Sequence, residues 1–362
     1  SGRGLTMQRR GFLASLAATA MAPRLGWADA GSPSYLAAAQ TATGTYELHG
    51  LTQTGDSIFR LPLPARGHAA TAHPSLPHAV AFARRPGTFA LVIDCARGLE
   101  LARLTPPQGR QLNGHGAFSA DGSVLYTSEQ VAETSQGRIG LWSVPGYRRL
   151  GEIPSHGTGP HEIRRLPMSD DLLVANGGIA TDPTDRTKLN IDRMRPNLAR
   201  VTPGGSLVSL AEPPEGMHQN STRHLALLPD GNAACALQWE GDPAEAPPLL
   251  ALWSEGALAL CEPPLEEAFT MANYAGSIAC SHDTRQIAIT SPKGGAVQVF
   301  GMDGVFQATH RRADVCGIAA ASGGFVVTDG NGAISRLDAD GLRPMKAHPV
   351  QWDNHLIALN AV

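Results

Sequence analysis

Histidines are the residues of this sequence whose type and spacing could do chemistry. Neutral imidazole is the commonest metal ligand in proteins and suits iron, copper, zinc and nickel. The chain has 13 histidines, and five stand at the same place in a recurring segment, where we expect them to bind metal. These five are His78, His115, His161, His224 and His355. The alternative is that they are structural imidazoles that hold turns.

Further polar residues lie close to the five histidines in sequence. An arginine beside a histidine suggests an anionic guest, such as a carboxylate or a metal chelate. A solvated rim is the alternative interpretation. We expect a cofactor or bound complex to contact Asn113, Glu162, Asn220, Arg223 and Cys316. His68 could extend a metal site, but we expect it to lie in a loop.

The element that carries these residues is a repeat of two short apolar strands joined by a tight turn. It is clearest at His115 to Ser128 and at His224 to Leu237, where the turns contain Asp-Gly. Asp-Gly suits tight hairpins because both residues accept positive φ. Seven copies start 37 to 63 residues apart, and one four-stranded propeller blade takes about 40–50 residues. The copies begin at His78, His115, His161, His224, Ser277, Gly317 and His355.

The two ends of the chain complete each other. After the last start, at His355, there is room for only one strand, and residues 35–40, 44–51 and 57–61 supply three more. A blade shared by both termini removes the edge strands of an open sheet. The sequence therefore predicts an all-β, seven-bladed β-propeller (WD40/YVTN-like). It would be a single domain over residues 31–362, with N- and C-terminal strands closing one blade.

The first strand of each propeller blade lines the central channel, so the histidines should form a ring at one mouth of the hub. The long connections of the chain fall on the same face. A metal–nitrogen bond is about 2.0–2.1 Å long, and we expect the hub to be too wide for one ion to meet five rings. A subset of the histidines, a multinuclear site or a bound complex would fit better.

The N-terminus carries a twin-arginine export motif, Arg9-Arg10, followed by a short apolar stretch and Ala28-Asp29-Ala30. This pattern predicts a signal peptide over residues 1–30, cleaved after Ala30, and a periplasmic protein. The apolar stretch is too short to span a bilayer. We expect no membrane span after cleavage, and a monomer.

Composition excludes several classes. The chain has 29 basic and 32 acidic residues and a net charge of −3, which does not provide the positive footprint that nucleic acid requires. Five cysteines occur without a C-x-x-C-H motif, which excludes covalent haem. The expected cofactor is iron or copper.

The chain resembles the family called domain of unknown function 1513. The resemblance implies a twin-arginine-exported periplasmic propeller, often encoded near imelysin-like, iron-regulated exported proteins. It implies as partner an imelysin-like or other exported iron-handling protein. It rests on residues 114–122, 159–163, 174–179, 188–190, 194–197, 223–224, 274–277 and 314–317.

Three functions remain open at this point. The first is a periplasmic metal-binding or metal-handling propeller linked to iron or copper uptake. The second is a lactonase- or dehydrogenase-like enzyme, in which Glu162 or a hub histidine is a general base and Arg223 holds an oxyanion. The third is a scaffold that docks another exported protein. No Ser–His–Asp spacing, P-loop or dinucleotide motif favours the enzyme.

Overall fold

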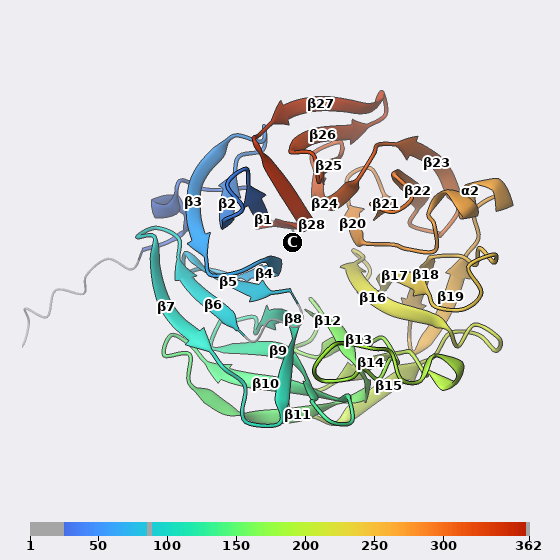
Figure 1. Ribbon diagram of the computed structural model, residues 1–362, viewed down its shortest axis with the longest axis horizontal. Coiled ribbons are helices and arrows are strands. Elements are labelled where there is room, and N and C mark those ends of the chain that lie inside the picture. Colours follow the sequence, from blue (N-terminus) through green and yellow to red (C-terminus); the bar gives the residue numbers. More distant parts are fainter. Residues whose placement is uncertain (1–24, 85–88, 360–362) are drawn as a thin grey trace, which may run out of the picture.

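Seven four-stranded antiparallel sheets surround a central axis in the computed structural model, which describes residues 25–84 and 89–359 (Figure 1). We number the sheets as blades one to seven. Blade one contains β4 (Gly67–Ala72), β5 (His78–Ala83), β6 (Ala90–Asp94) and β7 (Leu99–Leu104). Blade two contains β8 (Arg110–Phe118), β9 (Val124–Val131), β10 (Gln136–Ser143) and β11 (Arg149–Thr158). Blade three contains β12 (Pro160–Arg165), β13 (Leu172–Asn176), β14 (Asn197–Val201) and β15 (Leu207–Ala211).

The remaining blades follow the same order from the hub outward. Blade four contains β16 (Asn220–Leu227), β17 (Ala233–Trp239), β18 (Leu250–Ser254) and β19 (Ala257–Cys261). Blade five contains β20 (Ser277–Ser281), β21 (Gln286–Ser291), β22 (Ala296–Gly301) and β23 (Phe306–Arg311). Blade six contains β24 (Val315–Ala321), β25 (Gly324–Asp329), β26 (Ala333–Asp338) and β27 (Gly341–Ala347). Short helices are η1 (Trp27–Ala30), η2 (Ile191–Arg193) and α2 (Leu265–Thr270).

Blade seven joins the two ends of the chain. Its order is β28 (Val350–Ala358), β1 (Tyr35–Thr41), β2 (Tyr46–Leu51) and β3 (Ser57–Leu63). β28 pairs antiparallel with β1, and the red C-terminal strand lies beside the blue N-terminal one in Figure 1. The prediction of an all-β, seven-bladed propeller closed by both termini is confirmed.

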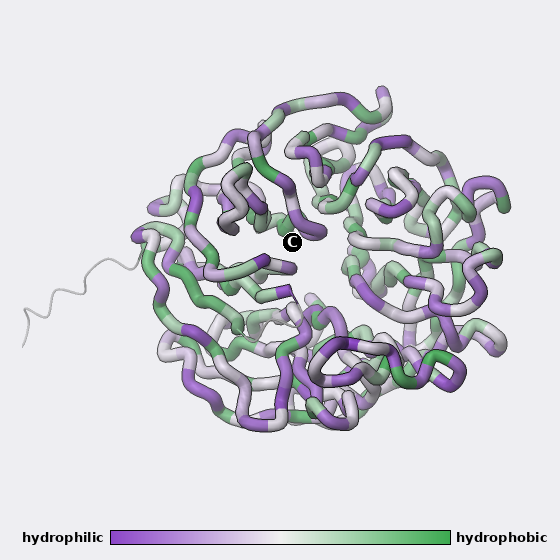
Figure 2. The backbone as a smooth tube through the Cα atoms, viewed as in Figure 1, coloured by the Kyte–Doolittle hydropathy of each residue, from purple (hydrophilic) through white to green (hydrophobic). Residues whose placement is uncertain are grey.

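The outermost strand of each blade is the least buried. All residues of β6 and β13 are buried, whereas β7 and β15 at the rim are mostly exposed and mix hydrophilic with hydrophobic residues (Figure 2). A strand that is covered on both faces has a nearly continuous run of apolar residues, whereas a half-exposed strand contains polar residues as well. The hydrophobic core therefore lies between neighbouring blades.

The expected register of blade one was wrong. His78 begins β5, the second strand, and the innermost strand is β4, which contains His68. The reason is that β5 is buried and strongly apolar, whereas Gly-His-Ala-Ala-Thr-Ala in β4 has only small side chains besides His68. The other predicted histidines lie within innermost strands, not before them.

The expected signal motif at Arg9-Arg10 lies outside the described residues. Within residues 25–84 and 89–359, no helix has both the length and the apolar character needed to cross a bilayer. Residues Trp27–Ala30 form η1, and the Trp27 indole donates a hydrogen bond to the carbonyl of His73 at 2.9 Å.

Candidate metal centre

The innermost strands bulge at one level of the hub. Five of the six irregularities of pairing in the innermost strands fall at or beside a histidine, and the sixth, between Val315 and Ile318 in β24, falls at Cys316 and Gly317. Bulges of this kind re-aim a side chain and are frequent next to functional sites. Regular pairing is interrupted between Gly67 and Ala70 in β4, Leu112 and Gly116 in β8, Pro160 and Ile163 in β12, Thr222 and His224 in β16, and Trp352 and Leu356 in β28. In contrast, β20, which supplies Ser277 and no histidine, pairs without interruption.

Five imidazoles from five blades meet at this level, and we call them the hub cluster: His68, His115, His161, His224 and His355. Their ring centroids form a closed circuit in that order, with neighbours 4.9, 4.7, 4.7, 4.5 and 4.8 Å apart. His68 is partly exposed and the other four are buried. The imidazoles of neighbouring blades therefore lie close together around the hub.

The ring nitrogens of the hub cluster form two overlapping groups of three. His68, His115 and His355 make one group, and His115, His161 and His224 make the other, with ligand atoms within 4.8 Å of one another in each. Three imidazole nitrogens at this separation can converge on one metal ion with small side-chain movements. Each group is a candidate metal site, and His115 belongs to both.

The donors in the cluster fit a transition metal. Burial lowers the pKa of His115, His161 and His355 well below the usual value, with the neighbouring charged groups contributing, so these rings are neutral and have a free lone pair. Nδ1 of His161 and Nε2 of His355 are buried without a hydrogen-bond partner among the described residues. Since an unsatisfied buried polar atom is costly, a metal ion bound by these nitrogens would remove that cost.

Glu162 orients one ring of the cluster. Its Oε2 accepts hydrogen bonds from Nδ1 of His224 and from the backbone N–H of Leu225, both at 3.2 Å, and its Oε1 pairs with Arg164 at 2.7 Å. Burial alone would raise the pKa of Glu162, but Arg164 and His224 outweigh it and lower the pKa to about 2. The anionic carboxylate therefore leaves Nε2 of His224 as the ligand nitrogen, an arrangement found around many protein metal sites.

Ser277 and Gly114 help to place the rings of His355 and His68. The Ser277 hydroxyl lies 3.4 Å from Nδ1 of His355. Nε2 of His68 lies 3.1 Å from Nε2 of His115. Gly114 has φ of +96°, and a Cβ there would lie 2.7 Å from Cδ2 of His68. Only glycine at this bulge leaves room for the His68 ring.

Some of the residues predicted to contact a cofactor lie at the hub cluster, and others do not. Glu162 touches it, and Arg223 lines the cavity above it. Asn113 and Asn220 donate hydrogen bonds to the carbonyls of Pro160 and Pro248, at 2.7 and 2.8 Å, and so hold backbone segments.

Cys316 and His78 have structural surroundings. The Cys316 thiol is buried at the carbonyls of Thr328 and Asp353, and burial raises its pKa to about 12, so it is a neutral thiol. His78 lies outside the hub cluster, with Nδ1 2.8 Å from the hydroxyl of Tyr147. His68, which was not among the five predicted ligands, had one sequence signal, a histidine in a run of small residues directly upstream of an apolar strand.

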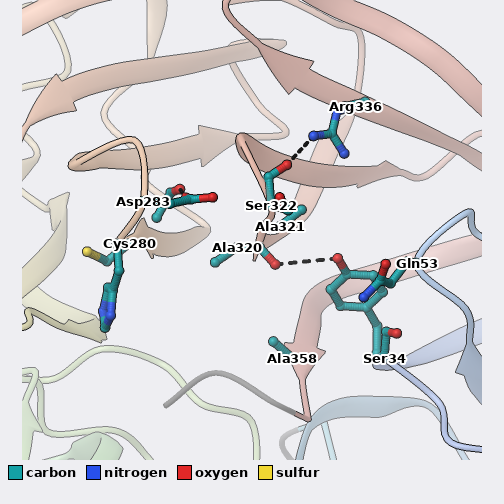
Figure 3. A pocket seen from close by; sticks show the side chains of 12 residues that line it. Ser34, Gln53, Cys280, Asp283, Ala320, Ala321, Ser322, Arg336 and Ala358 are labelled. Carbon is teal, nitrogen blue, oxygen red and sulfur yellow. Dashed lines mark hydrogen bonds between the residues drawn. The ribbon is translucent and has the colours of Figure 1, made fainter.

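Cavities lie on both sides of the hub cluster. His68, His161 and His224 line a polar cavity of about 280 Å³ on the face of the long connections. On the other side, Leu225, Ile278 and Leu356 line an apolar one of about 230 Å³. The cavity at the opposite mouth, of about 400 Å³, has no residue of the cluster, and Figure 3 shows Asp283, Ser322 and Arg336 in its wall.

A family model described as a protein of unknown function, DUF1513, matches residues 61–359. No curated protein is significantly similar to the chain. Among solved structures, the chain is similar to Kuenenia stuttgartiensis hydrazine synthase, with a TM-score of 0.58 and 13% identity. That match covers 84% of this chain and 89% of the other. At this identity the similarity concerns the fold alone.

Proposed function

The chain belongs to the DUF1513 family, and we propose that it is a metal-binding propeller whose hub cluster holds iron or copper. We further propose that the protein works in the periplasm, in iron or copper uptake, with an imelysin-like or other exported iron-handling protein as partner. The location rests on the twin-arginine motif at Arg9-Arg10, and the partner on the family resemblance.

The observation that carries the proposal is the closed circuit of five imidazoles from five separate blades, four of them buried. Histidines that only hold turns bond within their own blade. Here the ring nitrogens face the rings of other blades, and two of them are buried without a hydrogen-bond partner among the described residues.

The kind of metal follows from the donors. The two groups of three contain only imidazole nitrogens, which suit iron, copper, zinc and nickel better than magnesium or calcium. When bound, the metal would supply Lewis-acid or redox chemistry, and the chain's own part is to hold it in the hub behind a cationic cavity.

Metal content of tag-free protein tests the proposal. Mass spectrometry should find about one or more iron or copper ions per chain in the parent, and none in the triple variant His115→Ala, His161→Ala, His224→Ala. His218→Ala is the matched control, because His218 is exposed and belongs to neither group. Circular dichroism would confirm that each variant is folded. If the triple variant does not fold, the single variant His161→Gln takes its place in the metal measurement. Parent protein that takes up neither metal after loading would refute the proposal.

A further inference from the structure

The cavity above the hub cluster is strongly cationic. Among the residues that the structure describes, five cationic side chains and one carboxylate line it, and His161 and His224 form part of its wall. Like charges gathered in one cavity repel each other. Burial lowers the pKa of Arg186, and the nearby charge of Arg84 lowers it further. The charged lining residues are Arg84, Arg186, Lys188, Arg223, Lys293 and Glu240.

Glu240 does not balance this charge. It pairs with both Lys188 and Arg223, the latter with 3.5 Å between Nη2 and Oε1. The Arg223 side chain is only 9% exposed, and its Nε is buried with no hydrogen-bond partner among the described residues. A buried guanidinium with an unsatisfied N–H, beside a shared carboxylate, favours an additional anion.

The cationic residues come from four blades. Arg84 follows β5 in blade one, Arg186 and Lys188 lie between β13 and β14 in blade three, Arg223 is in β16 of blade four, and Lys293 follows β21 in blade five. The charges are therefore distributed around the mouth of the hub. Several separate anionic groups match this distribution better than one compact phosphate.

Two of these side chains are held in defined positions. Arg186 has φ of +67°, a conformation that costs free energy in a non-glycine residue and occurs often at ligand sites. Its turn is closed by a hydrogen bond from its N–H to the carbonyl of Asp182 at 3.1 Å. Nζ of Lys293 lies 4.5 Å from the centre of the Tyr274 ring.

We propose that this cavity binds a small polycarboxylate that touches the metal ion held by the hub cluster, so that the protein takes its metal together with a carboxylate ligand. The contact with the metal depends on the function proposed above, whereas the cationic cavity does not. A cavity of about 280 Å³ is at the lower limit for drug-sized ligands, ~300–1,000 Å³, and suits a di- or tricarboxylate.

Calorimetric titration with tricarballylate tests the proposal on metal-free and on metal-loaded full-length protein. We expect binding in both states, with higher affinity in the loaded state. The double variant Arg186→Gln, Lys293→Gln should bind ~10-fold or more weakly, because it loses two charge-assisted contacts. The matched control is Arg60→Gln, Lys346→Gln, which removes two exposed charges outside this cavity and should bind as the parent does.

The outcomes separate the two proposals. Metal bound without any tricarballylate binding would overturn the polycarboxylate site and leave the metal site standing. Equal affinity for tricarballylate with and without metal would overturn the contact between the carboxylate and the ion. Phosphate that binds as tightly as tricarballylate would overturn the assignment of the ligand as a polycarboxylate. Tricarballylate binding to a chain that takes up no metal would overturn the joint site and the proposed function, but not the anion cavity.

Discussion

At the scale of single residues, Glu162 connects the hub cluster with the surrounding charges. Its two oxygens divide their contacts between His224 on one side and Arg164 on the other. The carboxylate contacts Nδ1 of the His224 ring, so in the metal site that we propose Glu162 is a positioning residue.

Replacing Glu162 with Gln should weaken metal binding by ~10–100-fold, the usual effect of losing such a partner of a ligand histidine. The amide no longer fixes Nδ1 of His224 as the donor. Competition with a chromophoric chelator would measure the dissociation constant, and Glu162→Asp should restore part of it. Unchanged affinity in a folded Gln variant would contradict a positioning role.

Single residues also show where the sequence was informative. Four histidines of the hub cluster could be predicted because each recurs beside an apolar strand with a tight turn. His68 could not, because the other side chains of β4 are small and give no strong apolar signal. The apolar run of β5 drew the prediction to His78, which is ten residues further on.

At the scale of elements, the bulged innermost strands determine where the imidazoles point. Gly114 lies within the irregular part of β8 and provides the room for His68. Spacing along the chain does not reveal bulges, so the sequence could predict a ring of histidines at the hub but not which ring nitrogens lie close enough to share one metal ion.

Gly114→Ala should therefore lower both stability and metal affinity. Backbone strain at positive φ costs about 1–3 kcal/mol, and the added methyl group would also displace the His68 ring. Gly109→Ala is the matched control, because Gly109 also has positive φ, at +77°, but has nothing within 4 Å of the added Cβ. Denaturant unfolding and metal titration of both variants would separate strain from displacement. Equal metal affinity in the two variants would contradict the role given to Gly114.

A charge network connects three strands of blade two. Glu152 in β11 pairs with Arg110 in β8 at 2.7 Å and with Arg138 in β10 at 3.3 Å. The hydrogen bonds from Arg110, with the nearby arginines, lower the pKa of Glu152. A carboxylate with a lowered folded-state pKa stabilises the fold above its unfolded pKa and loses that contribution as pH falls through the folded value.

Glu152→Gln should thus cost about 0.5–1 kcal/mol at pH 7, as expected for a partly exposed network. The difference in unfolding free energy between parent and variant should shrink as pH falls below the ordinary glutamate pKa. Urea unfolding at pH 7 and at acid pH would measure it. A difference that stays constant with pH would argue against the network.

At the scale of the whole molecule, the propeller is a ring closed by non-covalent pairing. β28 and β1 share blade seven, and the N–H of Leu359 bonds to the carbonyl of Ser34 at 3.0 Å. The sequence could predict this closure from the missing strands at each end. It could not predict the diameter of the hub, because packing between blades sets it.

A circular permutant should keep both the fold and the metal. Joining the ends near Ser34 and Leu359 with a short linker, and opening the chain between β7 and β8, leaves every blade intact. A chain that ends before β28 should instead expose the edge of β1 and aggregate, and it would lack His355. Size-exclusion chromatography and metal content would compare the two. A permutant that folds without binding metal would show that closure alone does not build the site.

An anomalous diffraction map of iron- or copper-loaded crystals tests the hub metal site most directly. We expect a peak inside the hub cluster, about 2.0–2.1 Å from at least three imidazole nitrogens. A map in which bound metal lies only on the surface, with the five rings unliganded, would contradict this expectation.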